Sequence, residues 1–279
     1  MAELTTPALL LRSIDYGESD RIITLLGRTT GCLGAIARGA RKSQRRFGGG
    51  LGLCTVGDAA LRERGGSELL TLERFEATET FPSLGTDVVR MGHAAYVAEL
   101  LAKLCAPRQP EPAIFDLALE FLVLLEARGA QTLRLRAFEL ALLEGLGFAP
   151  TLDACLSCGR TDLSTSETID VRFIAEQGGV VCFGCTRQGR SMRPVVRLAL
   201  ARLASTPLGE ADALVDADAI PADVERGCRG ALQEVIAGHL SAPLRSLEFL
   251  SKLELDGSVA RAAGINIDRA AGAAGEGTS

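Results

Sequence analysis

The sequence is poor in aromatic and imidazole side chains. Its 279 residues include no Trp, two Tyr and two His. The histidines, His93 and His239, fall in helical patterns without an accompanying Ser, Cys or carboxylate motif, so each is expected to be structural rather than a general base. The sequence also lacks the Gly-x-x-x-x-Gly-Lys-Ser/Thr pattern of a phosphate-binding loop. These absences argue against catalytic chemistry, and we expect a protein that is not an enzyme.

Long apolar segments are absent as well. No run approaches the roughly 18 uncharged apolar residues that a membrane-spanning helix needs. The N-terminus contains Glu3 and has no basic region leading into an apolar stretch, so nothing resembles a secretory signal. Hydrophobic residues make up 47% and charged residues 23%, as in ordinary globular proteins. We therefore expect a cytoplasmic protein with no membrane partner.

Eight cysteines are present, and disulfides are rare in the cytoplasm. Four of them form two pairs, Cys155-Leu-Ser-Cys158 and Cys182-Phe-Gly-Cys185, which are 23 residues apart. This spacing is typical of a zinc ribbon, in which four thiolates complete a tetrahedral site. Such a site has no open coordination position, so one zinc ion is expected as a structural cross-link.

The surroundings of these pairs suggest how the metal is used. Residues 151–190 contain few aliphatic side chains, so metal binding is expected to supply much of the folding energy of this segment. The other cysteines fall within apolar patterns and are predicted to be ordinary core residues. They are Cys32, Cys54, Cys105 and Cys228.

The N-terminal segment has the pattern of a small β-barrel. Five short strands, separated by glycine-bearing turns, are predicted over 8–14, 21–26, 32–37, 54–64 and 67–77. The last two are joined by Gly65-Gly66, which suits a two-residue hairpin turn. Five strands in about 80 residues favour the oligonucleotide-binding (OB) fold, and an SH3-like barrel is the alternative.

Helical periodicity replaces the strand pattern after Pro82. It returns beyond the cysteine segment, so one helical domain brackets an inserted module. The expected fold is therefore α+β and multidomain, with an N-terminal five-stranded OB-fold β-barrel, an α-helical domain and an inserted four-cysteine zinc ribbon. The boundaries are 1–82 for the barrel, 83–150 and 191–256 for the helical domain, 151–190 for the zinc module and 257–279 for a disordered tail rich in Ala and Gly.

A basic run lies between two predicted strands of the barrel. It places five positive charges in nine residues without an acidic residue: Arg38, Arg41, Lys42, Arg45 and Arg46. The net charge of −5 excludes a uniformly basic surface, so any nucleic-acid site must be a local patch. A flexible basic loop on a small barrel can follow a phosphate backbone, and we predict that these five residues bind nucleic acid. Phe47 adjoins the run, and we expect it to make an apolar contact rather than stack on a base.

In combination these motifs resemble the bacterial recombination mediator family RecO. The resemblance covers roughly residues 5–255. It is based on four segments: the stretch from Leu9 to Ile22 with its Tyr-Gly-Glu-Ser-Asp sequence, Thr30-Gly31, the run from Arg38 to Lys42, and the four-cysteine module. Some members of the family lack the cysteines, which supports a structural task for the metal.

The resemblance implies a DNA-repair protein that binds single- and double-stranded DNA and anneals complementary strands. With RecR as its partner, such a protein helps to load RecA onto strands coated by single-stranded-DNA-binding protein, and it is associated with the nucleoid. For docking of the acidic tail of that coating protein, the candidates are Arg134 and Arg136, on a predicted helix with Leu135 and Phe138.

Two other functions fit the residues by themselves. The first is a zinc-ribbon OB-fold protein of transcription or RNA metabolism. The second is a thiol oxidoreductase that uses the CxxC pairs, Cys155/Cys158 or Cys182/Cys185. Metal content and thiol reactivity separate the second from a zinc protein, whereas preference for DNA or RNA separates the two binding functions.

Overall fold

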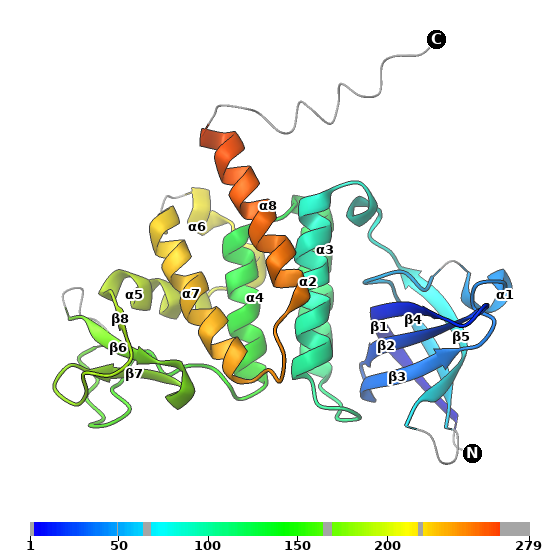
Figure 1. The fold of residues 1–279 in the computed structure, drawn as a ribbon, viewed down its shortest axis with the longest axis horizontal. Coiled ribbons are helices and arrows are strands. Elements are labelled where there is room, and N and C mark those ends of the chain that lie inside the picture. Colours follow the sequence, from blue (N-terminus) through cyan, green and yellow to red (C-terminus); the bar gives the residue numbers. More distant parts are fainter. Residues whose placement is uncertain (1–2, 49, 64–67, 164–168, 217–219, 263–279) are drawn as a thin grey trace, which may run out of the picture.

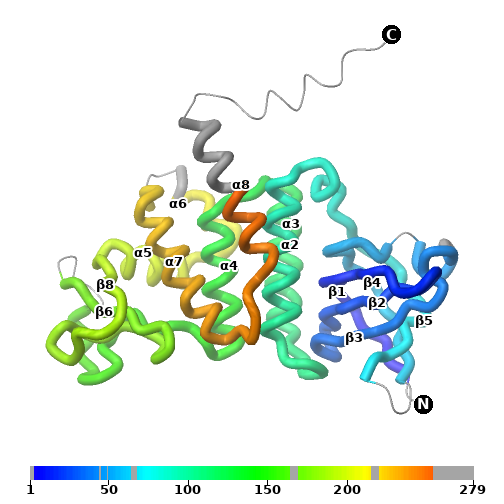
Figure 2. The backbone as a smooth tube through the Cα atoms, in the orientation of Figure 1, coloured from blue at the N-terminus to red at the C-terminus, as the bar shows by residue number. Residues whose placement is uncertain are grey.

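Three parts follow one another along the long axis of the molecule. In the computed structural model a β-barrel lies at one end, a group of helices in the middle and a small sheet at the other end (Figures 1 and 2). The structure describes residues 3–48, 50–63, 68–163, 169–216 and 220–262. This arrangement confirms the α+β class predicted from the sequence.

The barrel is closed by five strands in the order β1-β2-β3-β5-β4. Neighbouring strands are antiparallel, except that β3 and β5 pair in parallel. The predicted OB-type barrel is confirmed, while the predicted Gly65-Gly66 turn lies outside the described residues. The elements are β1 (Glu3–Tyr16), β2 (Asp20–Gly27), β3 (Gly31–Ala37), the short helix α1 (Gln44–Phe47), β4 (Val56–Arg62) and β5 (Leu70–Glu79).

The middle of the molecule is the predicted helical domain. It comprises α2 (Val88–Leu104), α3 (Pro112–Arg128), α4 (Thr132–Gly145), α5 (Pro194–Ala204), α6 (Ala213–Asp216), α7 (Ala222–Gly238) and α8 (Arg245–Ala262), with 3-10 turns at Pro82–Gly85 and Leu208–Glu210. The prediction of a disordered tail from residue 257 is wrong for its first six residues, because α8 continues through Ala262. Residues 263–279 lie outside the described part of the chain.

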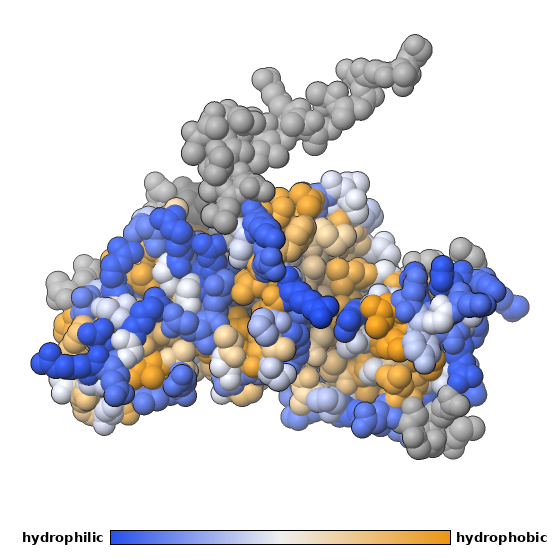
Figure 3. All heavy atoms as spheres, in the orientation of Figure 1, coloured by the Kyte–Doolittle hydropathy of each residue, from blue (hydrophilic) through white to orange (hydrophobic). Residues whose placement is uncertain are grey.

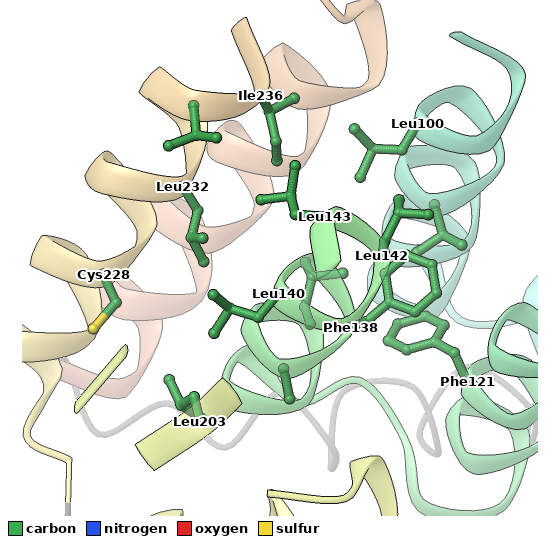
Figure 4. Close-up of a cluster of buried hydrophobic side chains, with 14 of the residues drawn as sticks. Leu100, Phe121, Phe138, Leu140, Leu142, Leu143, Leu203, Cys228, Leu232 and Ile236 are labelled. Atoms are coloured by element: carbon green, nitrogen blue, oxygen red, sulfur yellow. The ribbon is translucent and has the colours of Figure 1, made fainter. Parts of the chain in front are cut away.

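Helix α4 lies at the centre of this domain (Figure 4). On one side, Leu140 and Leu143 point toward α7. On the other side, the Phe138 ring packs on Phe121 of α3, with ring centroids 4.9 Å apart and planes tilted by 51°. Because α4 is covered on opposite sides, three of its charged residues, Arg134, Arg136 and Glu139, are buried.

The cysteine module is a three-stranded antiparallel sheet with the order β7-β6-β8. Its strands are β6 (Val171–Ile174), β7 (Gly179–Cys182) and β8 (Arg190–Met192), with a 3-10 turn at Ala175–Gln177 between β6 and β7. Its buried apolar side chains belong to the same core as the helices, and they are Leu152, Leu163, Val171, Phe173, Val180, Val181 and Met192. The expectation of a module with too few apolar residues for a core is therefore corrected, since this segment shares the core of the helical domain.

The barrel is attached to the helices through part of its outer surface. Leu9, Leu11 and Leu26 lie in the core that continues into α2 and α3, whereas a separate apolar cluster fills the barrel interior. At the edge of this contact, the backbone N–H of Arg108 donates to the carbonyl of Cys32 at 3.0 Å. A glycine is required at the neighbouring Gly31 (φ +75°), because a Cβ atom would lie 2.2 Å from the carbonyl oxygen of Gln109.

A buried polar network lies where α2 meets α4. Arg136 forms an ion pair with Glu139 at 3.1 Å, and the Tyr96 hydroxyl donates to Glu139 at 2.6 Å. His93 is buried beside this network. Burial, together with the positive charges of Arg136 and Arg134, lowers the pKa of His93 to about 3. The imidazole is therefore neutral, and it lies in the buried core of the helical domain.

We predict that His93 makes the protein sensitive to mild acid. The unfolded chain binds a proton at His93 near pH 6.5, whereas the folded chain binds it only near pH 3. With respect to this group, the free energy of unfolding is therefore highest above about pH 7. It falls as the pH drops below 6.5, and at pH 5 the loss from His93 is about 2 kcal/mol. Urea denaturation at pH 8 and pH 5 measures the effect.

The variant His93→Gln should lack this increment of acid sensitivity. His239→Gln serves as the matched control, because His239 is exposed and stacks on Phe148 with ring centroids 4.0 Å apart. This control should retain the wild-type difference between the two pH values. An undiminished acid effect in His93→Gln would assign the sensitivity to other groups.

Candidate nucleic-acid interface and metal centre

The basic run forms a loop at the end of the barrel that is farther from the helices, around α1 (Figure 1). The side chains of Arg38, Arg41, Lys42 and Arg45 are exposed, and that of Arg46 is half-buried. Figure 3 shows hydrophilic residues gathered over this end of the molecule. The sequence-predicted residues are thus brought together on one surface.

The turn between β1 and β2 holds this loop in place. The Asp20 carboxylate accepts a hydrogen bond from the backbone N–H of Gly39 at 2.8 Å, and the Ser19 carbonyl accepts one from the N–H of Arg41 at 3.0 Å. The Arg41 guanidinium also donates to the carbonyl of Glu18 at 3.3 Å. The segment from Glu18 to Asp20, which helps to carry the resemblance, therefore positions the basic loop. Sequence reasoning had not assigned this task to it.

Arg46 differs from its neighbours because it stabilises the loop internally. Its guanidinium donates to the Arg38 carbonyl at 2.6 Å and to the Ser43 hydroxyl at 3.2 Å. It also lies over the Phe47 ring, 5.0 Å from the centroid. Phe47 is only 2% exposed and belongs to the barrel interior, which confirms its assignment as an apolar contact.

The remaining cations of the loop are available to an anionic ligand. Arg41 lies 3.9 Å from the Asp15 carboxylate, and both side chains are largely exposed, so this pair contributes little to stability. Arg38, Lys42 and Arg45 form no ion pair within the described ranges. Arg12 of β1 is a further exposed cation that sequence reasoning missed. It ends an apolar run, and the sequence does not reveal which face of the strand it occupies.

The four predicted metal ligands converge at the tip of the small sheet. Their sulfur atoms all lie within 4.8 Å of one another. The Sγ atoms of Cys158 and Cys182 are 3.9 Å apart, and those of Cys182 and Cys185 are 3.5 Å apart. With zinc–sulfur bonds of about 2.3 Å, the edge of a tetrahedron is roughly 3.8 Å. The cluster therefore fits a single ion held by four thiolates.

Backbone hydrogen bonds favour the charged form of the most buried ligands. Burial raises the pKa of the Cys155 thiol. Hydrogen bonds from the backbone N–H groups of Cys182, Cys158 and Ser157 lower it by more than burial raises it, so that the net pKa is about 6. The Cys182 N–H lies 3.3 Å from Cys155 Sγ. The hydrogen bond with Cys182 raises the pKa of Cys185 to about 12. A bound cation would favour the thiolate form at all four positions.

The other four cysteines lie apart from this cluster and are buried, as predicted for core residues. Burial raises the pKa of the Cys54, Cys105 and Cys228 thiols to about 12. These groups therefore remain neutral thiols. The ligand set is limited to the two CxxC pairs among the residues that the structure describes.

The prediction that Arg134 and Arg136 dock a partner is wrong in this structure. Both side chains are only about 1% exposed. Arg134 donates to the Gly129 carbonyl at 2.8 Å and pairs with Asp212, while Arg136 pairs with Glu139. Both guanidinium groups are ion-paired inside the helical domain, because α4 is enclosed by its neighbours. A docking peptide has no access to them.

No helix in the described ranges is both long enough and apolar enough to cross a membrane.

Comparison with known proteins assigns the N-terminal and C-terminal regions of the chain to the same family. The model of the recombination protein O N-terminal domain matches residues 1–81, and that of the C-terminal domain matches residues 85–248. The match therefore covers the barrel, the helices through α7 and the cysteine module.

Similar full-length relatives are each named DNA repair protein RecO. The protein from Anaeromyxobacter dehalogenans (strain 2CP-C) is 38% identical over 253 residues, covering 91% of this chain and 98% of the relative. The relative from Anaeromyxobacter sp. (strain Fw109-5) is 39% identical, with coverage of 90% and 96%. That from Myxococcus xanthus is 34% identical, with coverage of 89% and 97%. The chain therefore belongs to the recombination protein O (RecO) family.

Proposed function

We propose that this protein is a DNA-binding recombination mediator in DNA repair. It anneals complementary single strands and, with RecR, helps to load RecA onto strands coated by single-stranded-DNA-binding protein. Family membership and the names of the relatives support the repair role. Acting on DNA, it would work in the cytoplasm at the nucleoid.

The exposed basic loop is the observation that carries this proposal. Arg38, Lys42 and Arg45 have no acidic partner among the described residues, so binding phosphate would not require existing ion pairs to break. The chain carries a net charge of −5, which makes this a local attraction rather than an effect of total charge. Phosphate contacts of this kind bind both single strands and duplexes, because they read no base.

The mechanism we propose is physical rather than catalytic. Cations of the loop neutralise phosphates and thereby reduce the repulsion between two strands, and base pairing then drives annealing. Arg46 and the Glu18–Asp20 turn hold the loop in position while this happens. No covalent step is needed, and we propose that the protein is not an enzyme.

We propose that the four-cysteine cluster binds one structural zinc ion. Cys155, Cys158, Cys182 and Cys185 would all be ligands, so no position would remain for a reacting water. The ion would cross-link the ends of the inserted sheet, whose apolar side already packs in the helical domain. A thiol oxidoreductase is less well supported, because two CxxC pairs converge on one point as a metal site requires.

The salt dependence of DNA binding tests the basic loop. Four exposed contacts to a single strand predict a slope of about −2.8 in log affinity against log salt. In Lys42→Ala/Arg45→Ala the slope should flatten by about 1.4, and affinity should fall alike for unrelated sequences. Titration of labelled oligonucleotides at several salt concentrations measures both. A matching RNA titration tests the alternative function in RNA metabolism.

The control for this titration is Arg187→Ala/Arg202→Ala, which removes two exposed arginines before β8 and in α5, at the end of the molecule opposite to the barrel (Figure 1). Its slope should equal that of the wild type, and circular dichroism should show both variants to be folded. An unchanged slope in folded Lys42→Ala/Arg45→Ala would place the DNA site elsewhere.

Annealing tests the mediator function directly. Complementary strands precoated with the cognate single-stranded-DNA-binding protein should anneal faster in the presence of this protein, as followed by fluorescence energy transfer between end labels. The acceleration should be reduced in Lys42→Ala/Arg45→Ala. An equal annealing rate with and without the wild-type protein would contradict the mediator assignment.

Metal analysis tests the zinc proposal. The wild type should contain about one zinc per chain, with the four clustered thiols protected from thiol reagents. Cys158→Ser or Cys182→Ser should lose the metal and expose residues 151–190 to protease, whereas the barrel keeps its separate core. Cys228→Ala is the matched control and should retain zinc, because Cys228 lies outside the cluster. A metal-free, protease-resistant Cys182→Ser protein would refute a structural ion.

A further inference from the structure

Strand β1 changes the face that it presents to the barrel interior. Just before the bulge, the Leu10 side chain points into the apolar cluster that fills the barrel interior. The pairing of β1 with β2 shifts register between Leu10 and Arg12, so that beyond the shift Ser13 lies opposite the interior residue Ile23. Since successive side chains alternate between faces, Arg12, Ile14 and Tyr16 lie on the outer face. Without the bulge they would point inward.

This shift creates a row of isoleucines across three adjacent strands. Ile14 of β1 pairs in register with Ile22 of β2, which in turn pairs with Ile36 of β3. Ile14 is 41% exposed, and the other two are half-buried. Their chain neighbours Ile23 and Ala35 point into the barrel, so this row belongs to the outer surface.

Aromatic and basic side chains border the isoleucine row. Tyr16 is 55% exposed and lies two residues beyond Ile14 on the same face of β1. Arg12 precedes Ile14 by two residues, and Arg38 follows Ile36 by two. Both arginines are exposed and form no ion pair within the described ranges. Figure 3 shows hydrophobic residues on the visible side of the barrel, next to the hydrophilic outer end.

We propose that this surface is where the unpaired bases of single-stranded DNA stack. The Tyr16 face is defined as Arg12, Ile14, Tyr16, Ile22, Ile36 and Arg38. The proposal rests on the DNA-binding function proposed above and adds to it a means of discriminating single strands from duplexes. Tyr16 supplies the ring, the isoleucines supply an apolar floor, and Arg12 and Arg38 lie where the sugar-phosphate backbone would pass.

The physical reason for discrimination is that a duplex hides the faces of its bases. Aromatic and apolar side chains gain stacking energy only from bases that are unpaired and unstacked, whereas phosphate contacts are available in both forms. The neighbouring cations Lys42 and Arg45 carry positive charge further along the same end of the barrel. This charge favours a nucleic acid as the occupant over an apolar peptide.

The middle of the outer surface of β1 is covered by the helical domain. Leu9 and Leu11 are buried in the core shared with the helices, at 1% and 3% exposure. Beyond the bulge the strand is uncovered at Arg12, Ile14 and Tyr16, and this part lies beside the basic loop that the Glu18–Asp20 turn holds. The Tyr16 face and the loop therefore form one continuous surface.

Intrinsic fluorescence offers a direct test, because the chain has no Trp and only two Tyr. Tyr96 is 1% exposed in the helical domain, whereas Tyr16 is 55% exposed. Titration of the full-length protein with oligothymidylate, corrected for absorption, should quench the tyrosine emission. Tyr16→Phe should abolish the quenching but keep the affinity, since the ring remains, and Tyr96→Phe should retain the quenching. Undiminished quenching in Tyr16→Phe would overturn the proposal.

Affinity measurements complete the test. Tyr16→Ala should weaken binding of oligothymidylate by about 5- to 100-fold, as expected for losing one stacked base. Binding of a duplex of equal length and the salt slope should stay unchanged. Phe249→Ala removes an exposed aromatic residue from α8 and should alter neither affinity. An equal loss for single strand and duplex, or no loss at all, would overturn the Tyr16 face.

The failure of this inference is distinguishable from failure of the proposed function. If the wild type binds DNA with a salt slope that depends on Lys42 and Arg45 while Tyr16→Ala is without effect, only the Tyr16 face is wrong. If the wild type binds no single-stranded DNA, the proposed function fails first.

Discussion

The apolar contact between the outside of the barrel and the helices determines which surfaces are left for ligands. Leu9, Leu11 and Leu26 lie outside the barrel wall, yet they are as buried as interior residues because the helical domain covers them. A small barrel has little surface, so covering one part concentrates its exposed residues at the opposite end. The basic loop lies at that end (Figure 1). At the bulge in β1 the outer face of the strand passes from the covered Leu9 and Leu11 to the exposed Arg12, Ile14 and Tyr16.

The core of the helical domain contains a buried ion pair among its apolar side chains. Arg136 and Glu139 are both fully buried on α4, and the Tyr96 hydroxyl reaches the same carboxylate from α2. Removing two charges from water is costly, so such a pair is weak evidence for high stability. Because both members of this pair lie on α4, the link to α2 is the hydrogen bond from Tyr96, and another register of the two helices would leave the buried Glu139 carboxylate without that donor. The central helix of this domain is thus fixed by polar as well as apolar contacts.

Much of the architecture was predictable because it depends on local patterns. Apolar residues at every second position indicate the strands, and apolar residues that recur about every 3.6 positions indicate the helices. The spacing of the cysteines in the two CxxC pairs indicates a metal site. Other features depend on contacts between distant segments. The inserted sheet shares the helical core through residues such as Val171 and Val180, although the composition of its segment suggested otherwise. Arg134 and Arg136 looked like surface residues because arginine usually is, but neighbouring helices enclose them.

The sequence by itself determined the family, the order of barrel, helices and inserted ribbon, the four clustered cysteines and the location of the basic run. These properties reside in the identity and spacing of residues close together in the chain. Only the tertiary structure decided which of the basic residues are free, since Arg46 binds the backbone of Arg38 while Lys42 and Arg45 face solvent. It also decided the face of Arg12, Ile14 and Tyr16, because a one-residue shift in strand pairing moves every following side chain to the opposite side of the sheet.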